Sequence, residues 1–442
     1  MHTKKKHTPL LNIVLSFAIV ILIGTLLLLL PFSTVEGKHF TFVDALFTST
    51  SAVCVTGLVP IPSLAESLTI FGKIVLALLI QIGGLGFVTI AIFVLVALGA
   101  RVGIANRYLA KEALNQSSAN GIVKLILWVM KVTLVIEFVG FVLSLIVFAQ
   151  DYPFLEACGI SAFHAISAFN NCGMDIIGSQ SLLAYKDNIL LNITTSLMII
   201  LGGIGFIVMQ DVISHRRWRR LATHSQIVIK VTTSLIVIGM IFLKITEGND
   251  ITWLQAFFHS VSARTAGFST IQFGLLKETT LIAIIILMFI GASPSSTGGG
   301  IKTTTFYVMY KSIISFARGK KAVTAHRKIS EDTKLRAFTL TSMALGVILL
   351  TTFLLLMFEQ NSKDYVPTIS NILFEVTSAF GTVGLSVGIT PYLTDASKII
   401  LCVVMFFGRL GPLTILGLWN KNWNRASDSD DVDYINAKII IG

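Results

Sequence analysis

Long apolar runs alternate with short polar intervals along the whole chain. The first apolar run covers residues 10–30, which is close to the ~20 residues that an α-helix needs to cross a bilayer. Residues 42–52 form an apolar segment that is too short to cross. A third run, at 68–98, is long enough, although a glycine cluster at 83–86 interrupts it. The pattern therefore predicts a unit made of a membrane span, a short helix, a loop and a second span.

The same order of segments follows three more times. The later first spans are predicted at 122–149, 227–245 and 338–358, the short helices at 154–167, 252–263 and 369–379, and the second spans near 189–213, 281–315 and 399–419. The four repeats would then cover residues 1–100, 101–220, 221–320 and 321–425, with a cytoplasmic tail at 426–442. This organisation predicts an all-α integral membrane protein with eight spans and four re-entrant hairpins around one pseudo-fourfold pore.

One short motif recurs in each unit, at the end of the short helix. A phenylalanine stands ten positions ahead of a glycine in all four copies. The pairs are Phe47 and Gly57, Phe163 and Gly173, Phe257 and Gly267, and Phe374 and Gly384. A serine stands four positions after the phenylalanine in three copies, whereas the third copy has Val261 there. Because the offset is constant, we interpret the four loops as the four walls of one pore.

Glycine at these positions suits ion conduction. Irregular backbone is not tolerated against lipid, because each unpaired polar group costs several kcal/mol, but it is tolerated along a water-filled path. There its carbonyl oxygens can replace the hydration shell of an ion, and glycine allows a positive φ without a Cβ clash. A helix that ends at the loop also points its negative end at the pore, which favours a cation. Helix packing by small residues is the alternative, although packing does not require one common offset.

Composition agrees with a membrane protein. The 442 residues are 54% hydrophobic and 13% charged. The four cysteines lack metal-ligand spacing, so neither a zinc site nor a disulfide framework is expected. The sequence offers no paired acids and no nucleophile beside a base, so we do not expect an enzyme. An organic-solute transporter would use inverted repeats, whereas these repeats are parallel. An ion-coupled carrier of sodium, potassium or a small solute stays open as the alternative function.

Positive charges gather on one side of the predicted membrane. The net charge is +11, and Lys and Arg concentrate after the second spans, as at 216–220 and 318–336. By the positive-inside rule, this arrangement places both termini in the cytoplasm and the four loops on the outer side. The basic intervals are therefore explained without nucleic acid. No interval is long enough for a soluble domain of useful size.

These motifs resemble those of the Trk/Ktr/HKT superfamily of potassium transporters, and most closely those of the Ktr-type membrane (pore) subunit. The most specific segments are SAVCVTG ending at Gly57, SARTAG ending at Gly267 and TSAFGTVG ending at Gly384. The resemblance implies channel-like potassium uptake across a bacterial plasma membrane, through a carbonyl selectivity filter. It also implies a homodimer and a cytosolic nucleotide-binding regulatory ring of the RCK/KTN type. Potassium is then the substrate, no cofactor is expected in this chain, and any nucleotide belongs to the regulatory partner.

The resemblance assigns two sets of residues. The ion-binding filter residues are Cys54, Val55, Thr56, Gly57, Asn171, Cys172, Gly173, Thr265, Ala266, Gly267, Thr382, Val383 and Gly384. The gate residues are Gly291, Ser293, Pro294, Gly298, Gly299, Gly300, Lys302 and Arg409. The second set depends on a break at 291–302, which falls about halfway through the membrane at ~1.5 Å per helical residue. In the family this intramembrane loop lies beneath the filter and acts as a gate, whereas a passive helix kink is the alternative.

Three charged residues fall at membrane depth. Arg409 lies by spacing at the level of the gate loop, where an arginine costs at least ~2.5 kcal/mol unless it is paired or faces water. The resemblance makes it an electrostatic barrier, and a bridge to loop carbonyls is the alternative. Arg264 is expected to brace the third loop, because a cation in the ion's path would repel the ion. Glu137 is expected to pair with Lys131 or Lys124 or to serve at an interface, although a carrier could use it.

Overall fold

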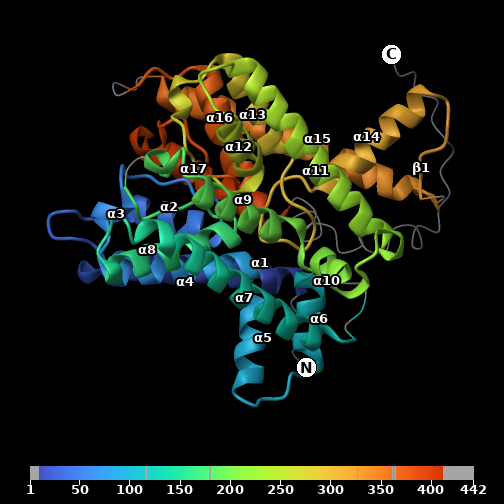
Figure 1. Cartoon of the computed structure of the whole chain (residues 1–442), viewed down its shortest axis with the longest axis horizontal. Helices are drawn as coiled ribbons and strands as arrows, with labels where there is room; N and C mark the ends of the chain where they lie inside the picture. The colour runs from blue at the N-terminus through green and yellow to red at the C-terminus, as the bar shows by residue number, and fades with distance from the viewer. Residues whose placement is uncertain are drawn as a thin grey trace, which may run out of the picture.

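The computed structural model is predominantly helical (Figure 1). The structure describes residues 9–114, 118, 120–178, 181–325, 327–360, 362 and 365–411. The predicted tail and the end of the fourth unit, from residue 412, lie outside this part of the chain. Among the described residues the only strands are β1 (Val323–Thr324) and β2 (Arg327–Lys328), which form a short antiparallel pair.

Four of the described helices are individually long and apolar enough to cross a membrane, and each is the first such helix of its unit. They are α1 (Pro9–Leu28), α7 (Ile122–Phe148), α11 (Thr223–Glu247) and α15 (Glu331–Glu359). All four coincide with the predicted first spans, which are therefore confirmed as helices. Large apolar side chains remain exposed along them, including Ile19, Phe138, Ile238 and Phe353. Such a surface is what a lipid-facing helix requires.

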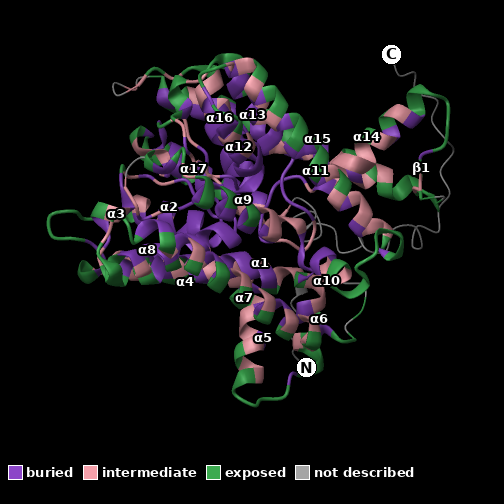
Figure 2. Ribbon diagram, viewed as in Figure 1, coloured by how far each residue is buried: buried purple, intermediate pink, exposed green. Residues whose placement is uncertain are grey.

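The four short helices are also confirmed, within two residues of their predicted ends. They are α2 (Phe42–Val53), α8 (Phe154–Phe169), α12 (Trp253–Thr265) and α16 (Ile369–Gly381), and each packs against the first span of its own unit. Three of them begin at a threonine, Thr41, Thr252 or Thr368, whose hydroxyl accepts a backbone N–H of the first turn. Figure 2 shows α2, α12 and α16 mainly in the colour of buried residues.

The second spans differ from the prediction because they are sharply broken. In the first two units α4 (Ile70–Leu85) meets α5 (Phe87–Ala97) at 100°, and α9 (Ile189–Ile204) meets α10 (Phe206–His215) at 98°. The hinges are Gly86 and Gly205, with φ of 82° and 97°, values that suit glycine. The third unit has α13 (Glu278–Phe289) and α14 (Thr303–Ala317), and the fourth has α17 (Asp395–Leu410).

The number of membrane crossings is not fixed by these helices. Four of the described helices, or six spans if each bent pair counts as one, could cross a membrane by length and composition. The eight spans therefore stay a prediction. The remaining described elements are α3 (Leu64–Ser67), α6 (Ile104–Ala113) and the 3-10 turns η1 (Pro31–Ser33), η2 (Leu183–Tyr185), η3 (Trp218–Arg220), η4 (Phe273–Leu275) and η5 (Thr390–Tyr392).

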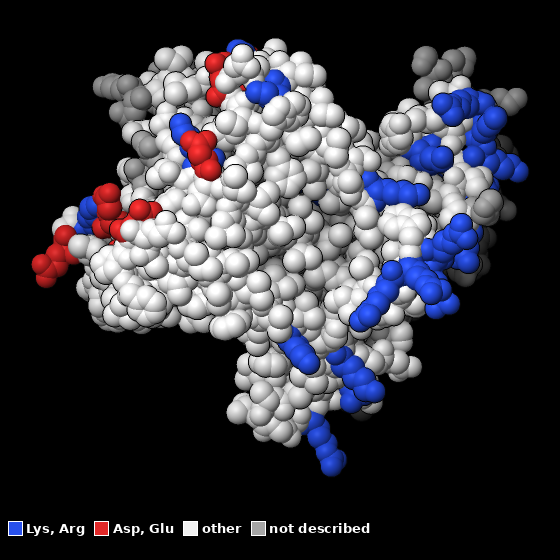
Figure 3. All heavy atoms as spheres, in the orientation of Figure 1, with Lys and Arg blue, Asp and Glu red and all other residues white. Residues whose placement is uncertain are grey.

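Charged side chains divide between two ends of the molecule. In the view of Figure 3 most Lys and Arg side chains cover the region of α10, α14 and β1 and the foot of the α5–α6 pair. Asp and Glu gather at the opposite end, near α3 and the starts of the short helices. This division follows the charge pattern of the sequence, and it agrees with loops on one side of a membrane and basic connections on the other.

Packing between the units follows a closed cycle. The second helix of each unit contacts the short helix of the next, with α4 on α8, α9 on α12 and α13 on α16. The cycle closes where α17 of the fourth unit packs on α2 of the first. There Lys398 donates a hydrogen bond to Asp44 at 2.9 Å, and these side chains are only 8% and 15% exposed. Because a buried ion pair is costly to break by removing one partner, this pair fixes the closing contact.

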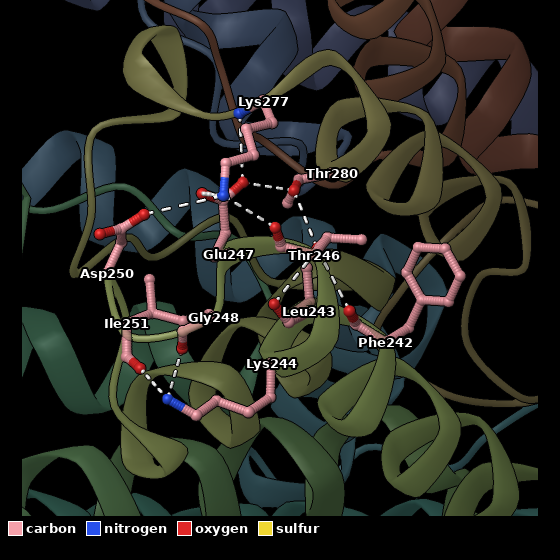
Figure 4. A network of polar contacts seen from close by, with 10 residues as sticks. All are labelled: Phe242, Leu243, Lys244, Thr246, Glu247, Gly248, Asp250, Ile251, Lys277 and Thr280. Atoms are coloured by element: carbon pink, nitrogen blue, oxygen red, sulfur yellow. Dashed lines mark hydrogen bonds and ion pairs between the residues drawn. The ribbon is translucent and has the colours of Figure 1, made fainter.

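An acid at the end of the first span orients the next long helix in two units. Glu247 at the end of α11 accepts hydrogen bonds from the Lys277 N–H at 3.1 Å and from the Thr280 hydroxyl (Figure 4). Glu359 at the end of α15 accepts from the N–H and the hydroxyl of Thr394, at 2.9 and 2.8 Å. A carboxylate is stabilised at a helix N-terminus, so each acid ties the start of α13 or α17 to its own unit.

Candidate ion pathway

The four loop glycines meet around one point. A Cβ atom built on Gly57 would overlap the carbonyl oxygen of Cys172. The other clashes complete a ring, with Gly173 against the carbonyl of Ala266, Gly267 against that of Val383 and Gly384 against that of Thr56. Each glycine thus faces the carbonyl of the residue that precedes the glycine of the next unit. Because no side chain fits at any of the four positions, the close approach of these loops requires glycine.

The backbone of the ring is held in the left-handed region. The four glycines have φ values of 95°, 76°, 78° and 91° in chain order. Two positions before the glycine, Val55, Asn171 and Thr382 also have positive φ, at 55°, 59° and 49°. Asparagine tolerates such angles, but the β-branched Val55 and Thr382 adopt them rarely, and strained backbone of this kind gathers at functional sites. The third loop is built differently, because α12 continues to Thr265 and Ala266 has a φ of −118°.

The predicted filter residues all lie in or beside this ring. Cys54, Val55, Thr56, Asn171, Cys172, Thr265, Ala266, Thr382 and Val383 are all buried. The side-chain amide of Asn171 and the Thr265 hydroxyl form a hydrogen bond of 2.7 Å, which joins the second loop to the third. Thr265 is the last residue of a helix and not part of a free loop. The Thr265 carbonyl therefore belongs to the last turn of α12. In this it differs from Val55, Asn171 and Thr382, which hold the same position in the other units.

A serine braces each loop. Ser51 and Ser378 accept hydrogen bonds from the N–H groups of Gly57 and Gly384, at 3.0 and 3.1 Å. Ser167 and Ser262 instead donate to the carbonyl oxygen that follows the loop glycine, that of Met174 or Phe268, each at 2.6 Å. The motif suggests that the third copy lacks its serine, because Val261 holds that position. The end of α12 explains the difference. This helix continues to Thr265, two positions before its glycine, and the brace comes one residue later.

Replacing Ser262 by alanine is expected to lower the free energy of unfolding by about 1–3 kcal/mol, because a buried carbonyl loses its donor. The matched control is Ser312→Ala on α14. Its hydroxyl also donates to a carbonyl, that of Val308 at 2.6 Å, but within its own helix, so little change is expected. The unfolding midpoints of the two purified variants and the wild type, measured by thermal unfolding, test this expectation. Equal midpoints would show that the serine does not brace the loop.

A buried acid that was not among the predicted site residues holds the chain after the fourth loop. Glu375 on α16 is fully buried, with 0% exposure. One carboxylate oxygen accepts from the Ser386 hydroxyl at 2.6 Å and from the Val387 N–H at 3.0 Å, and the other from the Thr390 hydroxyl at 2.8 Å. The sequence signal for this residue was an acid in the middle of an otherwise apolar short helix. Glu375 fixes the segment that leaves the ring.

A cavity of about 610 Å³ opens on the side of the ring away from the helix ends. Residues that follow the four glycines line it, among them Leu58, Met174, Ser269 and Leu385. Asp175 is the one charged side chain in this described lining. Burial raises the pKa of its carboxyl to about 6, so the group is ionised at neutral pH. The ring therefore has a water-accessible mouth with a negative charge on its wall.

The predicted gate loop lies directly against the other side of the ring. A Cβ atom on Gly298 would lie 2.8 Å from the side chain of Thr265, and the Gly299 N–H donates to the Thr382 hydroxyl at 2.9 Å. Residues between α13 and α14 form no helix, although Gly291 donates to the Ile301 carbonyl at 2.9 Å. The break is therefore an ordered loop, packed closely enough to require its glycines, and not a kinked helix.

The loop is hydrogen-bonded to the neighbouring units. The N–H groups of Ser293 and Thr297 donate to the carbonyls of Gly203 and Gly202, at 3.0 and 3.2 Å, and the Gly300 N–H donates to the Gly408 carbonyl at 3.4 Å. The glycines Gly202 and Gly203 of the second unit and Gly408 of the fourth unit are therefore contact points for this loop.

The apex of the loop touches the second unit again. Ser295 accepts a hydrogen bond from the Phe206 N–H at 2.9 Å, beside the α9–α10 hinge. A Cβ atom on Gly205 would also lie 2.5 Å from the Pro294 carbonyl. The hinge glycine and the loop apex therefore depend on each other for space.

Two cationic side chains hold the gate loop by its carbonyls. The guanidinium of Arg409 donates to the carbonyls of Thr297, Gly83 and Gly84, the last at 3.0 Å. Lys302 donates to the Gly298 carbonyl at 2.7 Å. Arg409 therefore bridges the loop to α4 of the first unit, as the bridging alternative predicted. The same side chain keeps a positive charge close beneath the ring. The bridge therefore does not exclude a second role of Arg409 as an electrostatic barrier.

Of the two roles expected for Glu137, the lysine pair is wrong, whereas a role at a contact between helices agrees with its hydrogen bonds. Glu137 does not pair with Lys131 or Lys124: its carboxylate accepts from Gln81 at 3.3 Å and from Asn170 at 3.2 Å. Asn170 also donates to Gln81 at 2.7 Å, so the acid joins three helices at the start of the second loop. The pairing failed because sequence proximity on α7 does not place a lysine on the same side as the acid.

The bracing role expected for Arg264 stays a prediction. Arg264 is buried at the end of α12, 7% exposed, and its Nε atom has no hydrogen-bond partner among the described residues. The hydrogen bonds that hold the third loop in the structure come from Ser262 and from the contact of Thr265 with Asn171.

Comparison with known proteins adds sequence relatives and a similar fold. The profile of the TrkH family, described as cation transport proteins, matches residues 2–424. The chain is 36% identical to Ktr system potassium uptake protein B of Bacillus subtilis (strain 168), over 99% of this chain and 97% of the relative. It is 38% identical to potassium/sodium uptake protein NtpJ of Enterococcus hirae, over 99% and 98%. The crystal structure of the potassium transporter TrkH from Vibrio parahaemolyticus has a similar fold, with a TM-score of 0.73, 19% identity and coverage of 96% and 87%.

Proposed function

The chain belongs to the TrkH family of cation transport proteins, and on that premise we propose that it is the pore-forming subunit of a Ktr-type potassium uptake system. The observation that carries the proposal is the closed ring of loop glycines, each against a carbonyl of the next unit. Relatives 36% and 38% identical over nearly their whole length are named as uptake proteins for potassium or for potassium and sodium. These relatives are transport proteins, which supports transport and not catalysis.

In the proposed mechanism the ring is the selectivity filter. A potassium ion enters from the outer cavity and exchanges its hydration water for backbone carbonyl oxygens. The carbonyls of Thr56, Cys172, Ala266 and Val383 are the candidates closest to the glycines. The carboxyl ends of α2, α8, α12 and α16 lie at the same loops and carry partial negative charge, which stabilises a cation there. The filter needs no cofactor in this chain.

The proposed gate is the loop beneath the ring. An ion that leaves the filter on that side meets the loop, together with the positive charges of Lys302 and Arg409, and like charges repel. Displacement of the loop would open the path. The same proposal includes the four-repeat, eight-span architecture and a bacterial plasma membrane. It also includes cytoplasmic termini, because the basic side chains gather at one end of the molecule (Figure 3).

The proposed partners are a second copy of the chain and a cytosolic ring. The name "Ktr system" of a relative indicates more than one component. We therefore place one pore in each protomer of a homodimer, and a nucleotide-binding ring of the RCK/KTN type against the basic face. Nucleotide would bind to that ring and not to this chain.

The test is growth of potassium-starved cells that lack their own uptake systems. Cells that express this chain with a candidate ring protein are expected to grow at low potassium, and cells with the chain alone are expected to grow less. Rb⁺ uptake into proteoliposomes, with and without sodium, checks the same activity in isolation. Because one relative is named for both ions, Rb⁺ uptake that requires sodium would favour the ion-coupled alternative. No growth and no Rb⁺ flux under any of these conditions would refute the proposal.

A further inference from the structure

The outer cavity has an asymmetric charge that the filter itself does not need. Its lining combines loops from all four units, yet in the described part of the chain it contains one charged side chain, Asp175. Polar groups such as Ser63, Gln272 and Ser386 also line it. No described lysine or arginine contributes to the wall. The field inside this cavity therefore comes from one carboxylate and from the negative helix ends at the ring.

The chain holds the Asp175 carboxylate in place beside the mouth of the ring. Asp175 stands two positions after Gly173, and one of its oxygens accepts a hydrogen bond from the Ile177 N–H at 3.3 Å. The residue is half-buried, so part of the side chain meets the water of the cavity. Glu375, the acid before the fourth loop, differs because it is fully buried and does not line the cavity.

We propose that Asp175 forms an outer binding site for a monovalent alkali cation, in which a still hydrated potassium ion waits before it enters the ring. The inference rests on the proposed potassium uptake and deepens it. A cleft with charge of one sign and walls of low dielectric constant raises the local concentration of counter-ions. The polar wall can keep most of the hydration shell, so the ion gives up its water only at the carbonyls. The site would set the affinity for external potassium, whereas the glycine ring sets the choice of ion.

A purely structural role for Asp175 is separable from this one. Asparagine has nearly the same shape, and its side-chain oxygen can still accept from the Ile177 N–H. Asp175→Asn therefore keeps the turn and removes the charge, whereas Asp175→Glu keeps the charge. The matched control is Asp187→Asn, which makes the same charge change at an exposed position between the same two helices, outside the described lining of the cavity.

The experiment measures Rb⁺ uptake at neutral external pH for the wild-type chain and the three variants. Asp175→Asn is expected to raise the apparent KM for Rb⁺ about tenfold, within the range by which charged clefts concentrate ions, with a smaller change in maximal rate. Asp187→Asn should match the wild type, and Asp175→Glu should recover most of the affinity. Added N-methylglucamine chloride should raise the wild-type KM toward that of Asp175→Asn, because salt screens the carboxylate. The KM of Asp175→Asn should respond much less.

Rb⁺ binding to the purified proteins by equilibrium dialysis separates this inference from the proposed function. Loss of one binding component in Asp175→Asn supports the outer site, even if uptake by the wild type fails and the uptake proposal falls with it. Identical binding and identical KM for Asp175→Asn and Asp187→Asn would overturn the outer site while uptake stands. A parallel loss of maximal rate and of preference over sodium in Asp175→Asn would also overturn it, because the residue would then shape the ring.

Discussion

Replacing Gly57 by serine is expected to remove most of the preference for potassium over sodium. A Cβ atom at Gly57 overlaps the Cys172 carbonyl, so that carbonyl must leave the ring. The φ of 95° at Gly57 adds backbone strain of about 1–2 kcal/mol for any side chain. A displaced carbonyl no longer replaces the hydration water of potassium, and a loss of ~1.4 kcal/mol of discrimination already means a tenfold change. Sodium competition against Rb⁺ uptake measures the effect, which we expect to be at least about tenfold.

Gly37→Ser is the matched control for this prediction. Gly37 has a φ of 82°, but no atom lies within 4 Å of a Cβ built there. It therefore carries a similar backbone strain without moving a carbonyl of the ring, and its competition curve should stay that of the wild type. Serine at Gly173, Gly267 or Gly384 should act like serine at Gly57. Unchanged sodium competition in all four ring variants would mean that the ring is not the filter.

Helix positions were predictable because they depend on local properties. An apolar run of the right length becomes a helix in any bundle, and α1, α7, α11 and α15 follow the predicted first spans. The ends of the short helices were also close, since threonine caps and loop glycines act within one turn. The four loop glycines were recognisable as one set because each lies against the carbonyl just before the glycine of another unit. This close approach requires glycine in every unit.

The bends and partners were not predictable because they depend on tertiary contacts. The glycines at 83–86 mark an interruption in the sequence, but not the size of the bend. The bend is 100° between α4 and α5, and 98° between α9 and α10, where the hinge at Gly205 meets the gate loop. The serine brace in the third loop lies one residue later because α12 ends closer to its loop glycine, which the motif alone does not show. Glu137 bonds to Gln81 and Asn170, which lie on other helices.

Replacing Arg409 by alanine is expected both to raise Rb⁺ flux and to lower thermal stability. The flux is measured without the cytosolic regulatory protein. The guanidinium holds the gate loop at the Thr297 carbonyl and α4 at the carbonyls of Gly83 and Gly84. Its loss frees the loop and leaves three carbonyls without this donor. It also removes a charge from beneath the ring. At an effective dielectric constant of about 20, like unit charges repel by about 4 kcal/mol at ~4 Å and by less at greater distance. Because each ~1.4 kcal/mol corresponds to about tenfold in rate, we expect a rise of about tenfold or more.

Two further substitutions at the same position separate the charge from the bridge. Arg409→Lys keeps the charge but lacks the planar fork that reaches several carbonyls at once, so it should be less stable than the wild type and still pass few ions. Arg409→Gln keeps hydrogen-bond donors without the charge, so it should lose less stability than alanine while its flux rises. Flux in proteoliposomes and thermal unfolding of the same preparations give the two readouts. If flux ranks the three variants by stability and not by charge, Arg409 acts as a bridge alone, and the barrier beneath the ring must then come from the loop backbone and Lys302.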